Sequence, residues 1–87
     1  MANVTVTNAA TKIVGANAQR LSLVIENNGS VTVYLGPDTS VSSSNGVPII
    51  SGGSFQEDSG GARMYQGDIY GITASSTSDL RYWERIR

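Results

Sequence analysis

The sequence predicts an all-β fold, a small antiparallel β-sandwich of jelly-roll type with seven or eight short strands. Apolar and polar residues alternate with a period of two along most of the chain, and no window shows a sustained helical period. Turn-forming residues interrupt the alternation every ~8–12 residues, which is the spacing expected of a sandwich or barrel. Charged residues make up only 15% of the 87 residues, so Ser, Thr, Asn and Gly supply the polar surface, as is typical of strands and turns.

The first two expected strands lie at the N-terminus. Val4 and Val6 alternate with Thr5 and Thr7, which favours either an edge strand or an extended arm over residues 1–10. The alternation resumes after Ala9-Ala10, and residues 11–15 are expected to form a second short strand.

A β-hairpin is the strongest local signal. Two alternating segments, 20–26 and 30–36, flank the tripeptide Asn-Asn-Gly. A three-residue loop that pairs Glu26 with Ser30 puts the large apolar residues on one face, whereas a slip by one residue would divide them between two faces. In such a loop Gly29 adopts the left-handed conformation and forms a bulge. The buried face of this hairpin would hold Leu21, Leu23, Ile25, Val31, Val33 and Leu35.

The second half of the chain carries four further expected strands. Residues 47–50 are predicted to be an edge strand, because Pro48 has no N–H group to donate to a neighbour. The other strands are expected at 54–57, 68–74 and 80–86, with loops or turns at 38–46, 58–67 and 75–79. The expected core consists of Leu21, Leu23, Ile25, Val31, Val33, Leu35, Ile49, Phe55, Ile72, Leu80 and Tyr82.

Composition argues against catalysis and against a cofactor or metal site. The chain has neither histidine nor cysteine, so it lacks the usual general base near neutral pH, the commonest metal ligand and any thiol nucleophile. A formal net charge of −1 disfavours nucleic acid as a partner. The longest apolar runs have about four residues, far fewer than the ~20 that cross a membrane. We therefore expect one non-enzymatic domain over residues 1–87, with no membrane span, made in the cytoplasm.

Two segments look like catalytic or metal sites but lack the required chemistry. Asp58-Ser59-Gly60-Gly61 resembles the nucleophile segment of trypsin-like proteases, but that serine needs an imidazole to accept its proton. Glu57, Asp58 and Asp68 offer oxygen ligands of the kind that Ca²⁺ prefers, yet their spacing matches no calcium loop. Both segments are expected to be ordinary acidic loops.

The last expected strand carries a basic and aromatic face. Arg81, Arg85 and Arg87 are half of the six basic residues, and strand alternation places them on one side together with Trp83. One interpretation is an edge strand that charge protects from aggregation. A second is a docking patch for a protein, since Trp and Arg are the residue types that anchor interfaces. A third, stacking of single-stranded nucleic acid on Trp83, is disfavoured by the acidic net charge.

The second face of the expected hairpin predicts self-association. Val24 and Tyr34 would lie there among Ser22 and Thr32, so this polar face would keep two apolar side chains. A chain of 87 residues without disulfides also gains stability by burying area between subunits. We therefore expect a homo-oligomer. The candidate partner-binding residues are Arg81, Trp83, Arg85, Arg87, Val24 and Tyr34.

Four segments together carry a likeness to a known class of proteins: RLSLVIENNGSVTVYLG over 20–36, NGVPI over 45–49, GSF over 53–55 and IYGI over 69–72. With them the chain resembles small β-sandwich accessory proteins of tailed-phage virions, of the capsid decoration (cement) or head-fibre type. The resemblance implies a structural role on the virion, with the major capsid protein or another virion protein as partner, and assembly as a homotrimer. The alternative is a carbohydrate- or receptor-binding module on a phage tail or fibre, whose exposed aromatic residues would be Tyr34, Tyr65, Tyr70 and Trp83.

Overall fold

Eight β-strands make up the fold. The computed structural model describes residues 2–58 and 65–86, and these residues contain no helix, so they offer no helical membrane span. The strands are β1 (Ala2–Val6), β2 (Thr11–Val14), β3 (Arg20–Asn27), β4 (Val33–Gly36), β5 (Val47–Ile49), β6 (Ser54–Asp58), β7 (Ile69–Thr73) and β8 (Ser78–Ile86).

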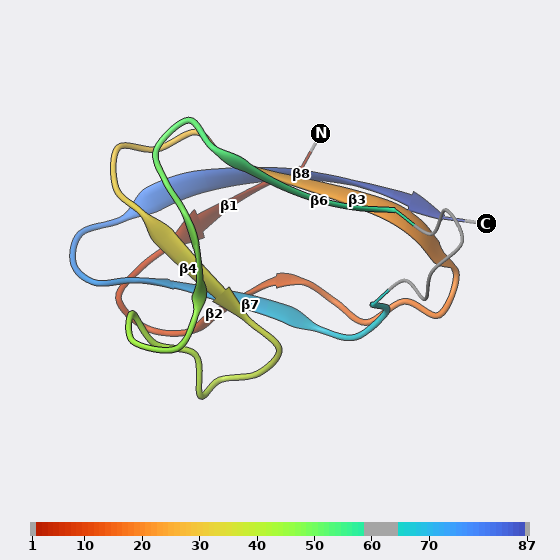
Figure 1. Ribbon diagram of the computed structural model, residues 1–87, viewed down its shortest axis with the longest axis horizontal. Helices are drawn as coiled ribbons and strands as arrows, with labels where there is room; N and C mark the ends of the chain where they lie inside the picture. Colours follow the sequence, from red (N-terminus) through yellow and green to blue (C-terminus); the bar gives the residue numbers. More distant parts are fainter. Residues whose placement is uncertain (1, 59–64, 87) are drawn as a thin grey trace.

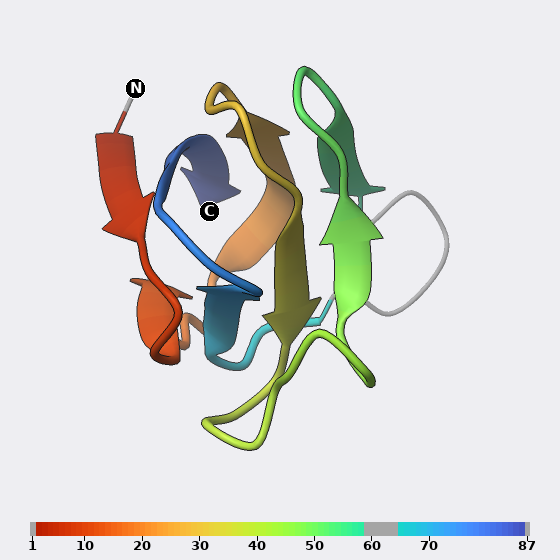
Figure 2. The same ribbon diagram turned by 90° about the vertical axis from the view of Figure 1, so that its left-hand side faces the viewer.

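The strands form two antiparallel sheets of four, packed face to face as a small β-sandwich. Sheet 1 has the order β1-β8-β3-β6 and sheet 2 the order β2-β7-β4-β5. Figure 1 shows sheet 1 above β2 and β7, and Figure 2 shows β1 and β2 at one side of the sandwich with β5 and β6 at the other. The pairs β1·β8, β2·β7, β3·β6 and β4·β5 are nested, which is compatible with the predicted jelly-roll winding. Residues 1–10, expected as an edge strand or an arm, supply the edge strand β1.

The core lies between the inner faces of the two sheets. Every second residue of β3, β4 and β8 points inward, as the alternation predicts, so Leu23 and Ile25 of one sheet face Val33 and Leu35 of the other. Ile49 and Leu80 are also buried as predicted, and Phe55 and Tyr82 pack partly buried against this cluster. Further core residues, absent from the predicted set, are Val6, Ile13, Val14, Val41 and Ile69.

The predicted hairpin between β3 and β4 is wrong. β3 pairs with β6 and β8 in sheet 1, whereas β4 pairs with β5 and β7 in sheet 2, so the chain crosses from one sheet to the other. Asn27 directs this crossing because its side chain is fully buried and hydrogen-bonded to distant segments. Its Nδ2 donates to the Val31 and Ile49 carbonyls at 2.8 and 2.9 Å, and its Oδ1 accepts from the Ser78 hydroxyl at 2.7 Å.

Gly29 is required by close packing and not by a left-handed turn. Among the described glycines only Gly52 has a positive φ, so the predicted bulge at Gly29 is also wrong. A Cβ at Gly29 would overlap the Ser78 hydroxyl and lie 2.8 Å from the Asp79 backbone nitrogen. The crossing segment therefore runs directly against the start of β8.

A β-bulge accounts for one error in the predicted core. The register of β3 against β8 shifts between Arg20 and Ser22, and as a result Arg20 points inward and is fully buried while Leu21 is only half-buried. Val31 precedes β4 and is half-buried. Ile72 is half-buried because Ile69, Gly71 and Thr73 form the inner face of β7, which leaves Ile72 on the outer face.

The segment 37–46, which contains the polar loop expected over 38–46, is ordered by its own hydrogen bonds. The Asp38 carboxylate accepts from the Ser40 backbone N–H at 2.9 Å and from the Ser40 hydroxyl. Asn45 closes the loop, since its Oδ1 accepts from the Ser42 N–H at 2.8 Å and its Nδ2 donates to the Ser40 carbonyl at 3.1 Å. Val41 is buried in the middle of the segment.

Candidate protein-docking face

Four of the predicted partner-binding residues share the outer face of sheet 1. Arg81, Trp83 and Arg85 alternate along β8 and are all exposed, with Trp83 66% accessible to solvent. Val24 of β3 lies directly opposite Trp83 in the antiparallel register and is half-buried. We call the surface formed by these four residues the Trp83 face. Arg87 lies outside the described residues.

The two arginines of the Trp83 face differ in their surroundings. Arg81 lies opposite Glu26 of β3, and its Nε is 3.3 Å from an Asp79 carboxylate oxygen. Arg85 lies opposite Ser22, and its side chain forms no ion pair within the described part of the chain. A carboxylate of the same strand thus lies beside Arg81, whereas no described ion pair engages the charge of Arg85.

The interpretation of β8 as a simple edge strand is wrong for its first half. β8 lies between β1 and β3: β1 pairs with Ser78–Tyr82, and β3 pairs with residues 80–86. From Trp83 onward, however, no described residue pairs with β8 on the β1 side. The interpretation of an edge strand that charge protects from aggregation therefore applies only to the C-terminal half of β8.

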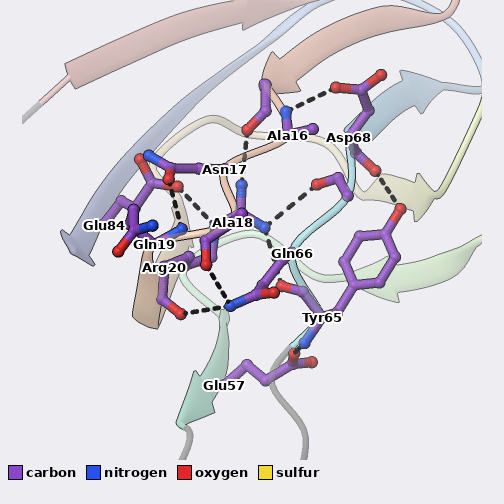
Figure 3. Close-up of polar contacts among 12 residues, drawn as sticks. Ala16, Asn17, Ala18, Gln19, Arg20, Glu57, Tyr65, Gln66, Asp68 and Glu84 are labelled. Carbon is purple, nitrogen blue, oxygen red and sulfur yellow. Dashed lines mark hydrogen bonds and ion pairs between the residues drawn. The ribbon is translucent and has the colours of Figure 1, made fainter. Parts of the chain in front are cut away.

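A buried ion pair under the end of β8 is the main feature that the sequence did not predict. Arg20 is fully buried, and its Nε lies 2.6 Å from Oε2 of Glu84, whose side chain is 19% exposed. The same guanidinium donates to the carbonyls of Gly15 at 2.7 Å, Tyr65 at 3.0 Å and Gly67 at 3.2 Å (Figure 3). Together with the ion pair, these bonds connect three parts of the chain: the loop between β2 and β3, the segment that precedes β7, and strand β8 itself. The available signal was Glu84, an acidic residue on the inner face of β8 that requires a cationic partner.

Tyr34 does not share a face with Val24, contrary to the expectation from the hairpin. Because β3 and β4 belong to different sheets, Val24 lies on the outer face of sheet 1 and Tyr34 on the outer face of sheet 2. Opposite Tyr34 lie Pro48 of β5 and Ile72 of β7, and loop 37–46 packs nearby. The argument for self-association that joined Val24 with Tyr34 therefore fails.

The four aromatic residues considered for sugar binding do not form one platform. Trp83 is on the outer face of sheet 1, whereas Tyr34 and Tyr70 are on that of sheet 2. The Tyr65 hydroxyl donates to the Asp68 carbonyl at 2.6 Å in the segment before β7 (Figure 3). Lys12 lies 5.9 Å from the centre of the Tyr70 ring, so that ring is already in contact with a cation.

Two of the three acidic residues considered for calcium, Glu57 and Asp68, have other partners. Glu57 accepts from the Tyr65 N–H at 2.7 Å, and Asp68 accepts from the Ala16 N–H at 2.7 Å and lies 3.8 Å from Lys12 Nζ (Figure 3). Within residues 2–58 and 65–86 no three acidic side chains converge on a common point. Ser59, Gly60 and Gly61 of the protease-like segment lie outside the described residues.

An apolar pocket opens between the sheets at the side where β5 and β6 lie. Its volume is about 220 Å³, and Glu57 is its one charged lining residue. The lining consists of Leu35, Gly36, Pro37, Val47, Phe55, Glu57, Tyr65 and Ile69.

Comparison with known proteins identifies no relative. The chain matches no protein-family model, no curated protein and no solved structure.

Proposed function

We propose that this protein is a non-enzymatic structural protein of a tailed-phage virion that binds the capsid surface and assembles as a homo-oligomer. The observation that carries the proposal is the Trp83 face, an exposed tryptophan between two arginines on a sheet whose other outward residues are mostly polar. The sequence resemblance to capsid decoration and head-fibre proteins supports a virion partner, and the major capsid protein is the first candidate.

The Trp83 face has the residue types and the energy that a docking site needs. A tryptophan side chain buries about 150–250 Å² in an interface, so covering the exposed two-thirds of Trp83 is worth about 2–4 kcal/mol at ~25 cal/mol per Å². The neighbours Ser22 and Gln56 carry no charge that a partner would have to desolvate. Arg85 adds a charge that steers an acidic partner into place.

Binding to capsids tests the proposal directly. Purified protein is mixed with capsids of its own phage that lack it, and bound protein is measured by co-sedimentation. We expect saturable binding that Trp83→Ala and Arg85→Glu each weaken at least tenfold, and that weakens as salt rises, because exposed charges are screened. Lys12→Glu is the matched control, since it makes the same change of charge on sheet 2.

Two results would contradict the proposal. One is an absence of binding to capsids at micromolar protein. The other is equal binding by Arg85→Glu and Lys12→Glu, which would mean that the Trp83 face is not the docking surface. Specific binding on a glycan array would favour the tail-fibre module instead.

The trimeric state is part of the same proposal and rests on the resemblance. Closed cyclic symmetry is the usual arrangement of soluble oligomers, and a chain of 9.1 kDa gains core-like area by association. Light scattering coupled to size exclusion should give a mass of three subunits. A mass of one or two subunits would refute the trimer in solution.

A further inference from the structure

The C-terminal end of β8 has a neighbouring strand on only one side among residues 2–58 and 65–86. On one side, β3 pairs with β8 as far as Ile86. On the other side, β1 pairs with β8 only as far as Tyr82, where Ala2 is the partner. Figure 1 shows β8 extending beyond β1 toward the C-terminus. The residue before Ala2 is Met1, which lies outside the described residues, so we give the name β8 ledge to residues 84–86.

The direction of the backbone groups on the ledge follows from one hydrogen bond. The Asp79 carbonyl accepts from the Asn28 N–H at 2.8 Å, so the backbone groups of Asp79 point toward β3. Successive residues of a strand direct their N–H and C=O groups to opposite sides. The backbone groups of Trp83 and Arg85 therefore point toward β3, whereas those of Glu84 and Ile86 point to the open side. Such a row of donors and acceptors is a template for another strand.

The side chains of the ledge make it attractive to an acidic and partly apolar segment. Arg85, like Trp83 directly before the ledge, points to the outer face, and Ile86 is 52% exposed at the end of the strand. Glu84 is paired with Arg20, so its charge is compensated inside the protein. Proline, which commonly blocks free edges, is absent from the ledge. The free charge at the ledge is thus positive.

We infer that the β8 ledge binds an extended segment of the capsid partner by strand addition, in line with β1. Main-chain hydrogen bonds to Glu84 and Ile86 supply affinity, and alternate side chains supply specificity. A carboxylate faces Arg85 and an apolar side chain faces Ile86, since directly opposed residues of an antiparallel pair share a face. The identity of the partner rests on the proposed function, but the strand addition is tested separately.

Two variants at one position separate backbone pairing from side-chain contact. Ile86→Pro removes the N–H that points to the open side, and β3 pairing is kept because that N–H does not face β3. Ile86→Ala keeps the N–H and loses the side chain. We expect Ile86→Pro to reduce capsid binding at least tenfold and Ile86→Ala less than about threefold, with similar melting temperatures for both. Equal binding by the two variants would overturn the ledge while leaving capsid binding intact.

Amide hydrogen exchange gives a second measurement that does not depend on variants. In the free protein the amides of Glu84 and Ile86 should exchange fast, and those of Trp83 and Arg85 slowly. Protein that exchanges while bound to capsids, and is then released and analysed by NMR, should show protection at Glu84 and Ile86. Binding without this protection would mean that the partner contacts only the side chains of the Trp83 face.

If the protein does not bind capsids, a peptide probe still tests whether the β8 ledge accepts an added strand. The probe is the capped peptide Thr-Val-Asp-Thr, whose Asp would face Arg85 and whose Val would face Ile86 in antiparallel register. At millimolar concentration it should shift the amide resonances of Glu84 and Ile86, and the same peptide with Lys in place of Asp should not. Shifts without capsid binding would keep the ledge and reject the proposed function. Failure of both capsids and peptide would reject the ledge as well.

Discussion

Replacing Arg20 by methionine should remove a large part of the free energy of unfolding. Methionine fills much of the volume of the arginine stem and removes the guanidinium. The guanidinium makes one ion pair, with Glu84, and three bonds to backbone carbonyls of Gly15, Tyr65 and Gly67. Arg20→Met therefore leaves a mostly buried carboxylate and three carbonyls without their donor.

The expected loss can be worked out from these contacts. Breaking a buried ion pair by removing one partner costs about 3–5 kcal/mol. A buried carbonyl that loses its donor costs about 1–3 kcal/mol, but water that enters the vacated space can restore part of this, so the total is expected at about 4–6 kcal/mol. At ~0.05–0.15 kcal/mol per residue, a chain of this length has a free energy of unfolding of only about 4–13 kcal/mol.

Urea denaturation followed by circular dichroism measures the effect as a change in midpoint at constant slope. Arg81→Met is the control, because Arg81 is exposed and its pair with Asp79 should contribute under about 1 kcal/mol. In the double variant Arg20→Met/Glu84→Gln the buried charge is gone, so part of the loss should return as a coupling of about 1–3 kcal/mol. A loss below about 1 kcal/mol for Arg20→Met would refute the role of this network.

Further predictions concern two glycines and one carboxylate. Gly29→Ala should lower the free energy of unfolding by about 1–3 kcal/mol, because its Cβ would overlap Ser78, whereas Gly15→Ala, with open space around it, should be neutral or slightly stabilising in the same denaturation experiment. The Ser40 hydroxyl, and next the Ser40 backbone N–H, hold the pKa of Asp38 below its ordinary value of 3.8. Its contribution to stability is therefore present above pH 3.8 and is lost as the pH falls through the lowered pKa. An NMR titration should show that Ser40→Ala moves this pKa up toward 3.8, and an unmoved value would contradict the assignment.

The alternation of apolar and polar residues predicted well where the strands lie and which side chains share a face, because it depends only on residues close together in the chain. Arg81, Trp83 and Arg85 were placed on one exposed face from spacing alone, and β8 contains no bulge that would change their parity. Arg20 shows the opposite case. The bulge between Arg20 and Ser22 reverses the parity of Arg20, the first residue of β3, and the sequence of β3 does not mark the position of the bulge.

Strand pairing was predicted less well, because it is decided by contacts far apart in the chain. Placing β3 and β4 in one hairpin, or in two facing sheets, satisfies the same alternation, since Leu23 and Val33 are buried either way. Asn27 decides between them through bonds to Ile49 and Ser78, which lie 22 and 51 residues away. The tripeptide Asn-Asn-Gly is a strong local signal for a hairpin turn, but here it lies where the chain passes from sheet 1 to sheet 2.

The β8 ledge arises from the same non-local pairing. β8 has nine residues, and β1, as far as it is described, pairs with the first five of them, Ser78–Tyr82. The sequence predicted a strand over 80–86 but not its neighbours, and only the registers Ala2↔Tyr82 and Arg20↔Ile86 show which side of Glu84 is open. The side chain of Glu84 is paired with Arg20 on the inner face of the sheet, while the backbone N–H and C=O of Glu84 point to the open side of β8. The network that stabilises the end of β8 therefore also fixes the edge to which we assign the partner segment.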